Sequence, residues 1–150
     1  MDADFSIYTK LDVMPKPKMP EVAYIIRGTT GYFKFNLQNK SYSFDDIDQA
    51  TFIFKQNDTL HSFELYDIDP EFQTKELNDH FTHEAGGDYD YIKFRLTVDD
   101  TLDFKATGYD LPMQYEVAIK LNSEDTITEE QFPVVVKDSL YGELLDSKRN

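Results

Sequence analysis

The sequence contains no cysteine and no long apolar run. Without cysteine the chain has no disulfides, no thiolate metal ligands and no cysteine nucleophile, which fits a reducing compartment. No apolar stretch approaches the roughly 20 residues that span a bilayer. The opening residues MDADFSIYTK carry acids where a signal peptide has basic and apolar regions. The sequence therefore predicts neither a membrane span nor a secretory leader.

Basic residues are scarce relative to acids. The chain has 15 Lys and Arg against 29 Asp and Glu, a formal charge of −14. Such a charge repels phosphate backbones, so we expect no binding to nucleic acid. A length of 150 residues favours one domain. The 12 Phe and 10 Tyr supply enough apolar area for its core.

Apolar and polar residues alternate with a period of two along much of the chain, which is typical of half-buried strands. The pattern predicts about seven strands, near Glu21–Arg27, Phe33–Leu37, Thr51–Gln56, Leu60–Tyr66, Ile92–Leu96, Tyr115–Leu121 and Phe132–Val136. Long helical periods are missing. Residues Phe72–Glu84 are compatible with a short helix or a long loop, and Lys137–Leu145 with a final turn or an edge segment. We predict an all-β, antiparallel sandwich.

The first 20 residues differ from the rest and end in MPKPKMP. Pro15, Pro17 and Pro20 lack ladder donors and favour extended geometry. Together with Met14 and Met19 they form a candidate docking arm that lies on a neighbouring subunit. A loose tail is the alternative. We therefore divide the chain into an extended arm at 1–20 and a β-sandwich domain at 21–150.

Two acid-rich stretches have the same spacing. In each, a hydroxyl residue precedes an acid by three positions: Ser43 and Asp46 in one, Thr97 and Asp100 in the other. This resembles a capping box with Asp in place of Glu. We predict short helical turns that cross between the sheets and bury the next apolar residue, Ile47 or Leu102. The stretch LTVDDTLDF lacks the glycine of a calcium loop, although a carboxylate pair for acid–base chemistry stays possible in principle.

Other chemistry-bearing residues are few. His80 and His83, beside Asp79 and Glu84, have the i, i+3 spacing of a metal pair, but we prefer the simpler interpretation of an exposed polar loop. The chain has no G-x-S-x-G, no phosphate-binding glycine loop and no H-E-x-x-H. We predict no catalytic, cofactor-binding or metal-binding residue, and a metal-dependent enzyme is the weakest hypothesis.

Several blocks resemble a known family. The stretch IIRGTTGYFKFNL (Ile25–Leu37) is similar to the I-R-G-T-T-x-x-F-x-F-x-L opening of small virion proteins from phages and prophages of Gram-positive bacteria. Three further blocks resemble that family: FIFKQNDTL at 52–60, LTVDDTLDF at 96–104 and YEVAIKLNSEDTITEEQFPVVVKDSL at 115–140. Val98 and Asp99 stand where that family usually has Gln and Glu. The likeness spans roughly 21–145, and the 1–20 arm and the 70–90 region are additions.

The resemblance implies a non-enzymatic protein with an immunoglobulin-like sandwich, distantly like the N-terminal domain of lactococcal phage upper baseplate proteins. A baseplate or tail adaptor, a head fibre and a capsid-decorating protein all fit. We expect a homo-oligomer that contacts other virion proteins in the virion, after assembly in the host cytoplasm, without nucleic acid, membrane or cofactor. The alternative is a carbohydrate-binding module whose exposed tyrosines contact host-wall glycans, although tryptophan is absent.

Overall fold

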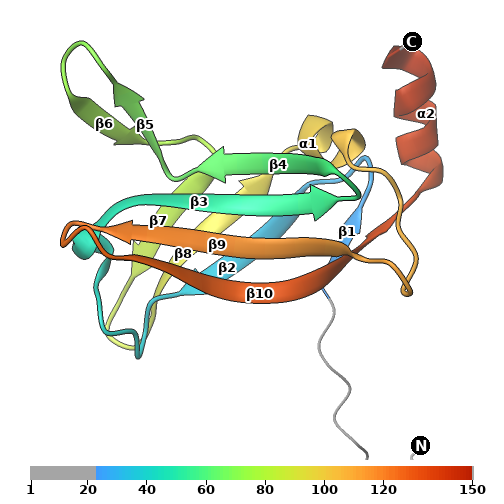
Figure 1. The fold of residues 1–150 in the computed structure, drawn as a ribbon. Coiled ribbons are helices and arrows are strands. Elements are labelled where there is room, and N and C mark those ends of the chain that lie inside the picture. The colour runs from blue at the N-terminus through green and yellow to red at the C-terminus, as the bar shows by residue number, and fades with distance from the viewer. Residues whose placement is uncertain (1–22, 150) are drawn as a thin grey trace, which may run out of the picture.

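Two β-sheets face each other in the computed structural model, which describes residues 23–149 (Figure 1). The five-stranded sheet has the order β1 (Ala23–Ile26), β10 (Thr126–Lys137), β9 (Met113–Leu121), β3 (Ile47–Gln56) and β4 (Thr59–Glu64). The three-stranded sheet has the order β2 (Gly31–Asn36), β8 (Asp90–Leu96) and β7 (Phe81–Ala85). A separate hairpin of β5 (Tyr66–Asp69) and β6 (Thr74–Leu77) projects from the sandwich. The predicted docking arm lies outside the described residues.

Aromatic side chains fill the space between the sheets. Phe52 and Phe54 of β3 face inward and are fully buried, as the alternating pattern predicts. The ring of Phe52 lies 5.0 Å from that of Phe94 in the opposite sheet, and Phe33 stacks on Tyr115 at 5.0 Å. Such contacts add stability beyond the area that the rings bury. The chain is therefore an all-β protein with a sandwich-like arrangement, and this prediction of fold class is confirmed.

All seven predicted strands are present, but the structure adds three in the region between 66 and 85. The prediction of a helix or loop at Phe72–Glu84 is wrong, because β6 and β7 occupy most of it. Both strands are short, and most of their residues are polar: TKE within β6 and THE within β7. In β7 only Phe81 is fully buried. The strand therefore has too few apolar residues for an alternating pattern to be recognised in the sequence.

One strand pair departs from the antiparallel prediction. Strand β1 runs parallel to β10, with Ala23 opposite Val134 and Ile26 opposite Lys137. The two strands come from opposite ends of the domain, so no short connection forces them to be antiparallel. The alternation identifies a strand but says nothing about the direction of its neighbour.

The last segment is also a correction. The sequence predicts a turn or an edge segment at 137–145, but helix α2 (Leu140–Arg149) begins there. The Ser139 hydroxyl accepts a hydrogen bond from the Gly142 N–H at 2.8 Å and donates one to the Arg27 carbonyl at 2.7 Å. Because Gly142 weakens the local helical preference, the helix depends on tertiary contacts. None of the helices among residues 23–149 is long and apolar enough to cross a membrane.

Two short helical turns carry the chain between the sheets. The 3-10 turn η1 (Phe44–Asp46) connects β2 to β3, and helix α1 (Val98–Asp103) connects β8 to β9. Ile47 and Leu102 are both buried at these crossings. Both turns therefore lie where the sequence predicts them, and each brings an apolar side chain to the core.

Candidate functional site

The turn at Thr97 forms a complete capping box. The Thr97 hydroxyl accepts a hydrogen bond from the Asp100 N–H at 3.2 Å. In return, one Asp100 carboxylate oxygen accepts hydrogen bonds from the Thr97 N–H at 2.8 Å and the Thr97 hydroxyl at 2.9 Å. The same oxygen lies 2.8 Å from Nε2 of His80, beside β7. Asp100 therefore has a local capping role and a tertiary contact.

The turn at Ser43 has the same geometry with weaker contacts. The Asp46 carboxylate accepts hydrogen bonds from the Ser43 N–H at 2.8 Å and the Ser43 hydroxyl at 3.2 Å. The Asp46 N–H donates to the Ser43 carbonyl at 3.0 Å. The Asp45 carbonyl accepts a hydrogen bond from the side chain of Asn122 in the β9–β10 turn, and the Asp46 carbonyl accepts one from the Asn122 N–H. This turn is thus held to the sandwich through its backbone carbonyls and through the Phe44 ring, which stacks on His83 at 3.9 Å.

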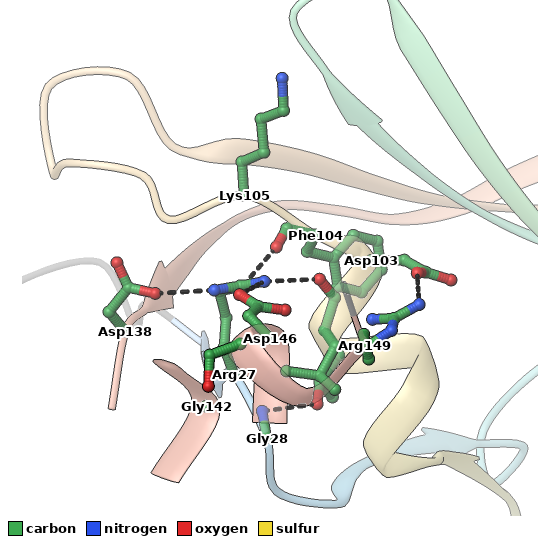
Figure 2. A network of polar contacts seen from close by, with 12 residues as sticks. Arg27, Gly28, Asp103, Phe104, Lys105, Asp138, Gly142, Asp146 and Arg149 are labelled. Atoms are coloured by element: carbon green, nitrogen blue, oxygen red, sulfur yellow. Dashed lines mark hydrogen bonds and ion pairs between the residues drawn. The ribbon is translucent and has the colours of Figure 1, made fainter. Parts of the chain in front are cut away.

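The end of α1 is bound by the side chain of Arg27 (Figure 2). Arg27 follows β1, and its Nε donates to the Phe104 carbonyl at 2.6 Å. Its Nη2 donates to the Leu102 carbonyl at 2.7 Å. A cation that binds the last carbonyls of a helix satisfies acceptors that the helix itself leaves open. Arg27 therefore links the first strand of the domain to α1.

The same guanidinium also binds carboxylates beyond β10. Arg27 lies 3.0 Å from an Asp138 oxygen and 2.8 Å from an Asp146 oxygen of α2. Burial alone would lower the pKa of Arg27, but its hydrogen bonds with these carboxylates outweigh that effect and raise the pKa. Nearby, Arg149 lies 3.1 Å from Asp103 (Figure 2). We call the set of Arg27, its two carbonyl partners and its two carboxylate partners the Arg27 joint.

Gly28 and Thr101 complete this region. Gly28 has a φ of +87°, and a Cβ there would lie 2.8 Å from Cα of Gly142. Its N–H donates to the buried Thr101 hydroxyl at 3.1 Å, which donates to the Thr29 carbonyl at 2.8 Å. Only glycine combines this backbone conformation with this close approach. The RGTT and DTLDF blocks thus meet in space and shape the backbone.

A second polar cluster lies at the other end of the sandwich, where β10 bulges between Glu129 and Phe132. Glu129 accepts a hydrogen bond from the Tyr42 hydroxyl at 2.8 Å and lies 2.7 Å from Nζ of Lys40. The Lys40 contact, more than that of Tyr42, lowers the pKa of Glu129. Burial raises the pKa of Glu130 to about 7, against the attraction of Lys40. Two adjacent acids therefore differ in their protonation.

The two histidines do not form the metal pair that their spacing indicates. His80 contacts Asp100, whereas Nε2 of His83 lies 2.6 Å from Asp90 and its ring stacks on Phe44 at 3.9 Å. The i, i+3 spacing suits a helix, but this segment is extended, where such a spacing points side chains to opposite sides. Both rings are half-buried, so the exposed-loop interpretation is also wrong. Within residues 23–149, no group of three or more His, Asp or Glu could hold a metal ion.

An open groove of about 810 Å³ lies on the outer face of the five-stranded sheet. Its lining is mainly apolar and comes from β3, β4, β9, β10 and the loop before β9; it includes Ile53, Leu60, Leu111, Pro112, Phe132 and Pro133. Leu60 is 66% exposed and Leu111 is 71% exposed. We call this surface the sheet groove. Sequence analysis missed it because its residues come from distant parts of the chain.

The outer face of the three-stranded sheet has a different character. Lys34 lies 4.4 Å from the centre of the Tyr91 ring, and Lys93 lies 4.7 Å from that of Tyr32. Other exposed tyrosines lie elsewhere, since Tyr24 on β1 meets Tyr109 edge-on. The exposed tyrosines are thus spread over separate surfaces. The two outer faces of the sandwich therefore offer different chemistry, one apolar and one cationic and aromatic.

Fold and site together define a two-layer all-β protein with a structural polar joint and an exposed apolar groove. Comparisons with protein-family models and with curated proteins find no match for the chain. The resemblance to small virion proteins therefore stays a prediction.

Proposed function

We propose that this chain is a non-enzymatic virion structural protein with an immunoglobulin-like sandwich. It acts as an oligomeric adaptor or anchor in the tail or baseplate, or on the head. The observation that carries the proposal is the sheet groove, where Leu60 and Leu111 are exposed beside a large apolar concavity. Exposed apolar patches of this kind mark protein-interaction sites.

The contacts of the polar residues also support this function. Arg27, Asp100 and Thr101 are engaged in contacts that fix the path of the backbone. These residues belong to the blocks that resemble the virion family, so a structural role accounts for those blocks without a ligand. Among residues 23–149, the outer faces of the two sheets are accessible for function.

The two outer faces suit an adaptor, because each offers a different kind of contact. The sheet groove is apolar, whereas the opposite face presents Lys34, Lys93 and tyrosine rings. A protein with two unlike faces can bind two unlike partners at once. Stable contacts of this kind commonly bury on the order of 1,200–2,000 Å².

The test is incorporation into particles. In a phage or prophage that encodes this chain, purified virions should contain it at a fixed ratio to the major capsid protein, measured by quantitative mass spectrometry. The double variant Leu60→Asp, Leu111→Asp should reduce incorporation at least tenfold. The control Leu140→Asp alters a residue that is 85% exposed on α2, outside the groove, and should incorporate normally.

Two outcomes would count against this function. Virions that lack the protein would rule it out as a structural component. Specific binding to host-wall polysaccharide, lost when Tyr32 or Tyr91 is replaced by Ala, would instead favour the carbohydrate-binding alternative.

A further inference from the structure

We propose that the sheet groove binds the segment Met14–Pro20 of a second copy of this chain. The inference rests on the proposed function and deepens it, because it names the groove as the site of self-assembly and the MPKPKMP segment as its ligand. Three observations carry it: the length of the groove, the chemistry of its lining, and the place where the described chain begins.

The segment has the right length. The groove extends across the sheet from Pro133 on β10 to Leu60 on β4. These strands are three positions apart in the sheet, a distance of about 15 Å at the usual strand spacing. Seven residues in polyproline geometry extend about 22 Å. An extended Met14–Pro20 segment can therefore cross the whole groove.

The chemistry is complementary. Proline-rich segments bind grooves lined by aromatic and apolar side chains, because they lose little entropy on docking, and methionine adapts to irregular apolar surfaces. The charged residues of the groove lining are two acids, Asp110 and Glu116, and one base, Lys55, so the lining has a net negative charge. Lys16 and Lys18 are the only charged residues within Met14–Pro20, in a chain whose formal charge is −14. The segment thus brings positive charge to an acidic protein.

The course of the chain favours a second copy as the source of the segment. Ala23 pairs with Val134, the neighbour of groove residue Pro133. Because β1 is parallel to β10, extending β1 backwards leads along the β10 edge towards Thr126, away from Leu60 and Leu111. The direction of β1 therefore does not lead into the groove of the same copy, whereas a second copy can present the segment from the open side of the groove.

This contact is heterologous, since the segment of one copy enters the groove of the next. Heterologous contacts generate rings when the rotation closes and open chains when it does not. Each copy therefore offers one segment and one groove. The association continues until the ring closes or the supply of copies ends.

A mixing experiment with the full chain tests the inference. The groove variant Leu60→Asp, Leu111→Asp keeps its segment intact, and the segment variant Met14→Asp, Met19→Asp keeps its groove intact. Analytical ultracentrifugation should show oligomers for the wild type and monomers for each variant alone. An equimolar mixture of the two variants should form a 1:1 heterodimer, because one functional segment and one functional groove remain.

Circular dichroism and thermal melts should show that both variants stay folded, since Leu60 and Leu111 are exposed. The control Leu140→Asp should associate like the wild type. A monomeric wild type, a groove variant that associates normally, or a mixture without heterodimers would each overturn the inference. Incorporation into virions is measured separately, so virions that contain the protein while the mixture fails would contradict the groove contact and leave the proposed function standing.

Discussion

The two crossover turns have the same capping pattern in their sequences but differ in their contacts with the rest of the fold. Each has a hydroxyl residue followed three positions later by Asp, and each moves the chain from the three-stranded to the five-stranded sheet. At the Ser43 turn the polar links to the sandwich are backbone carbonyls that accept from Asn122, and the Phe44 ring stacks on His83. At the Thr97 turn, Asp100 also contacts His80, and Arg27 binds the carbonyls that end α1. The capping pattern thus sets the shape of a turn, whereas tertiary partners set how much stability depends on it.

The largest expected effect comes from removing the cation of the joint. Arg27→Ala should lower the free energy of unfolding by about 3 kcal/mol, because it removes the donor to two part-buried carbonyls, those of Leu102 and Phe104, and the cation of two ion pairs. The control, Lys40→Ala near the Ser43 turn, should cost less than about 1 kcal/mol, since it breaks one partly exposed ion pair. Urea denaturation of both variants measures the difference. Equal losses would show that the two ends of the sandwich contribute alike.

The next effect concerns the close approach of α2 to the joint. A Cβ at Gly142 would lie 2.7 Å from the Arg27 carbonyl oxygen, a contact that backbone or helix must move to relieve. Gly142→Ala should therefore destabilise the protein by about 2 kcal/mol, within the usual cost of overpacking. Gly87→Ala is the matched control, because its Cβ would meet no atom within 4 Å. Thermal melts that show no difference between the two would contradict the packing of α2 against Arg27.

The direct comparison of the turns uses their acids. Asp100→Ala should cost about 1.5 kcal/mol, because it removes a complete capping box and the contact with His80. Asp46→Ala should cost about 0.5 kcal/mol, at the low end for a capping residue. Chemical denaturation at neutral pH gives both values. A larger loss for Asp46→Ala would reverse the order that the contacts predict.

The last effect depends on pH and belongs to the bulge of β10. Burial raises the pKa of Glu130 from 4.5 to about 7, so the folded protein holds a proton that the unfolded chain loses. The contribution of Glu130 to the free energy of unfolding is fully present below about pH 4.5 and is lost as the pH rises to about 7. Glu130→Gln should therefore remove this fall and raise the melting temperature at pH 8 relative to the wild type.

The neighbouring acid provides the opposite control. The contact with Lys40 and the hydrogen bond from Tyr42 lower the pKa of Glu129, so its ionised form stabilises the folded state. Glu129→Gln should lower the melting temperature at pH 8 and have less effect as the pH falls through the pKa of the folded protein. Melting curves for both variants between pH 4 and 8 should diverge in opposite directions. Curves that move together would contradict the different environments of the two acids.

Sequence analysis located the strongly alternating strands because burial on one face imposes a period of two. Strand β9, from Met113 to Leu121, shows this pattern over nine residues and is buried at every second position up to Ile119. Strand β7 and helix α2 were missed for opposite reasons. In β7 polar residues obscure the alternation. Helix α2 begins at Leu140, where the Ser139 hydroxyl binds both the Arg27 carbonyl and the Gly142 N–H.

The candidate sites were predictable only where their contacts are local. Ser43, Asp46, Thr97 and Asp100 could be assigned as turn residues because each hydroxyl and its acid are three positions apart. The Arg27 joint could not, because its carbonyl partners lie 75 and 77 positions away in the sequence. The sheet groove is equally non-local, since four strands and a loop supply its lining.

By itself the sequence determined the class of the fold and the capped turns, because alternation and capping act between residues a few positions apart. Only the tertiary structure decided that β1 runs parallel to β10 and that Arg27 links α1 to α2. It also decided that Leu60 and Leu111 line a common groove. These features depend on which distant segments share the same space. That choice follows from packing the whole core, which no short stretch of the chain encodes.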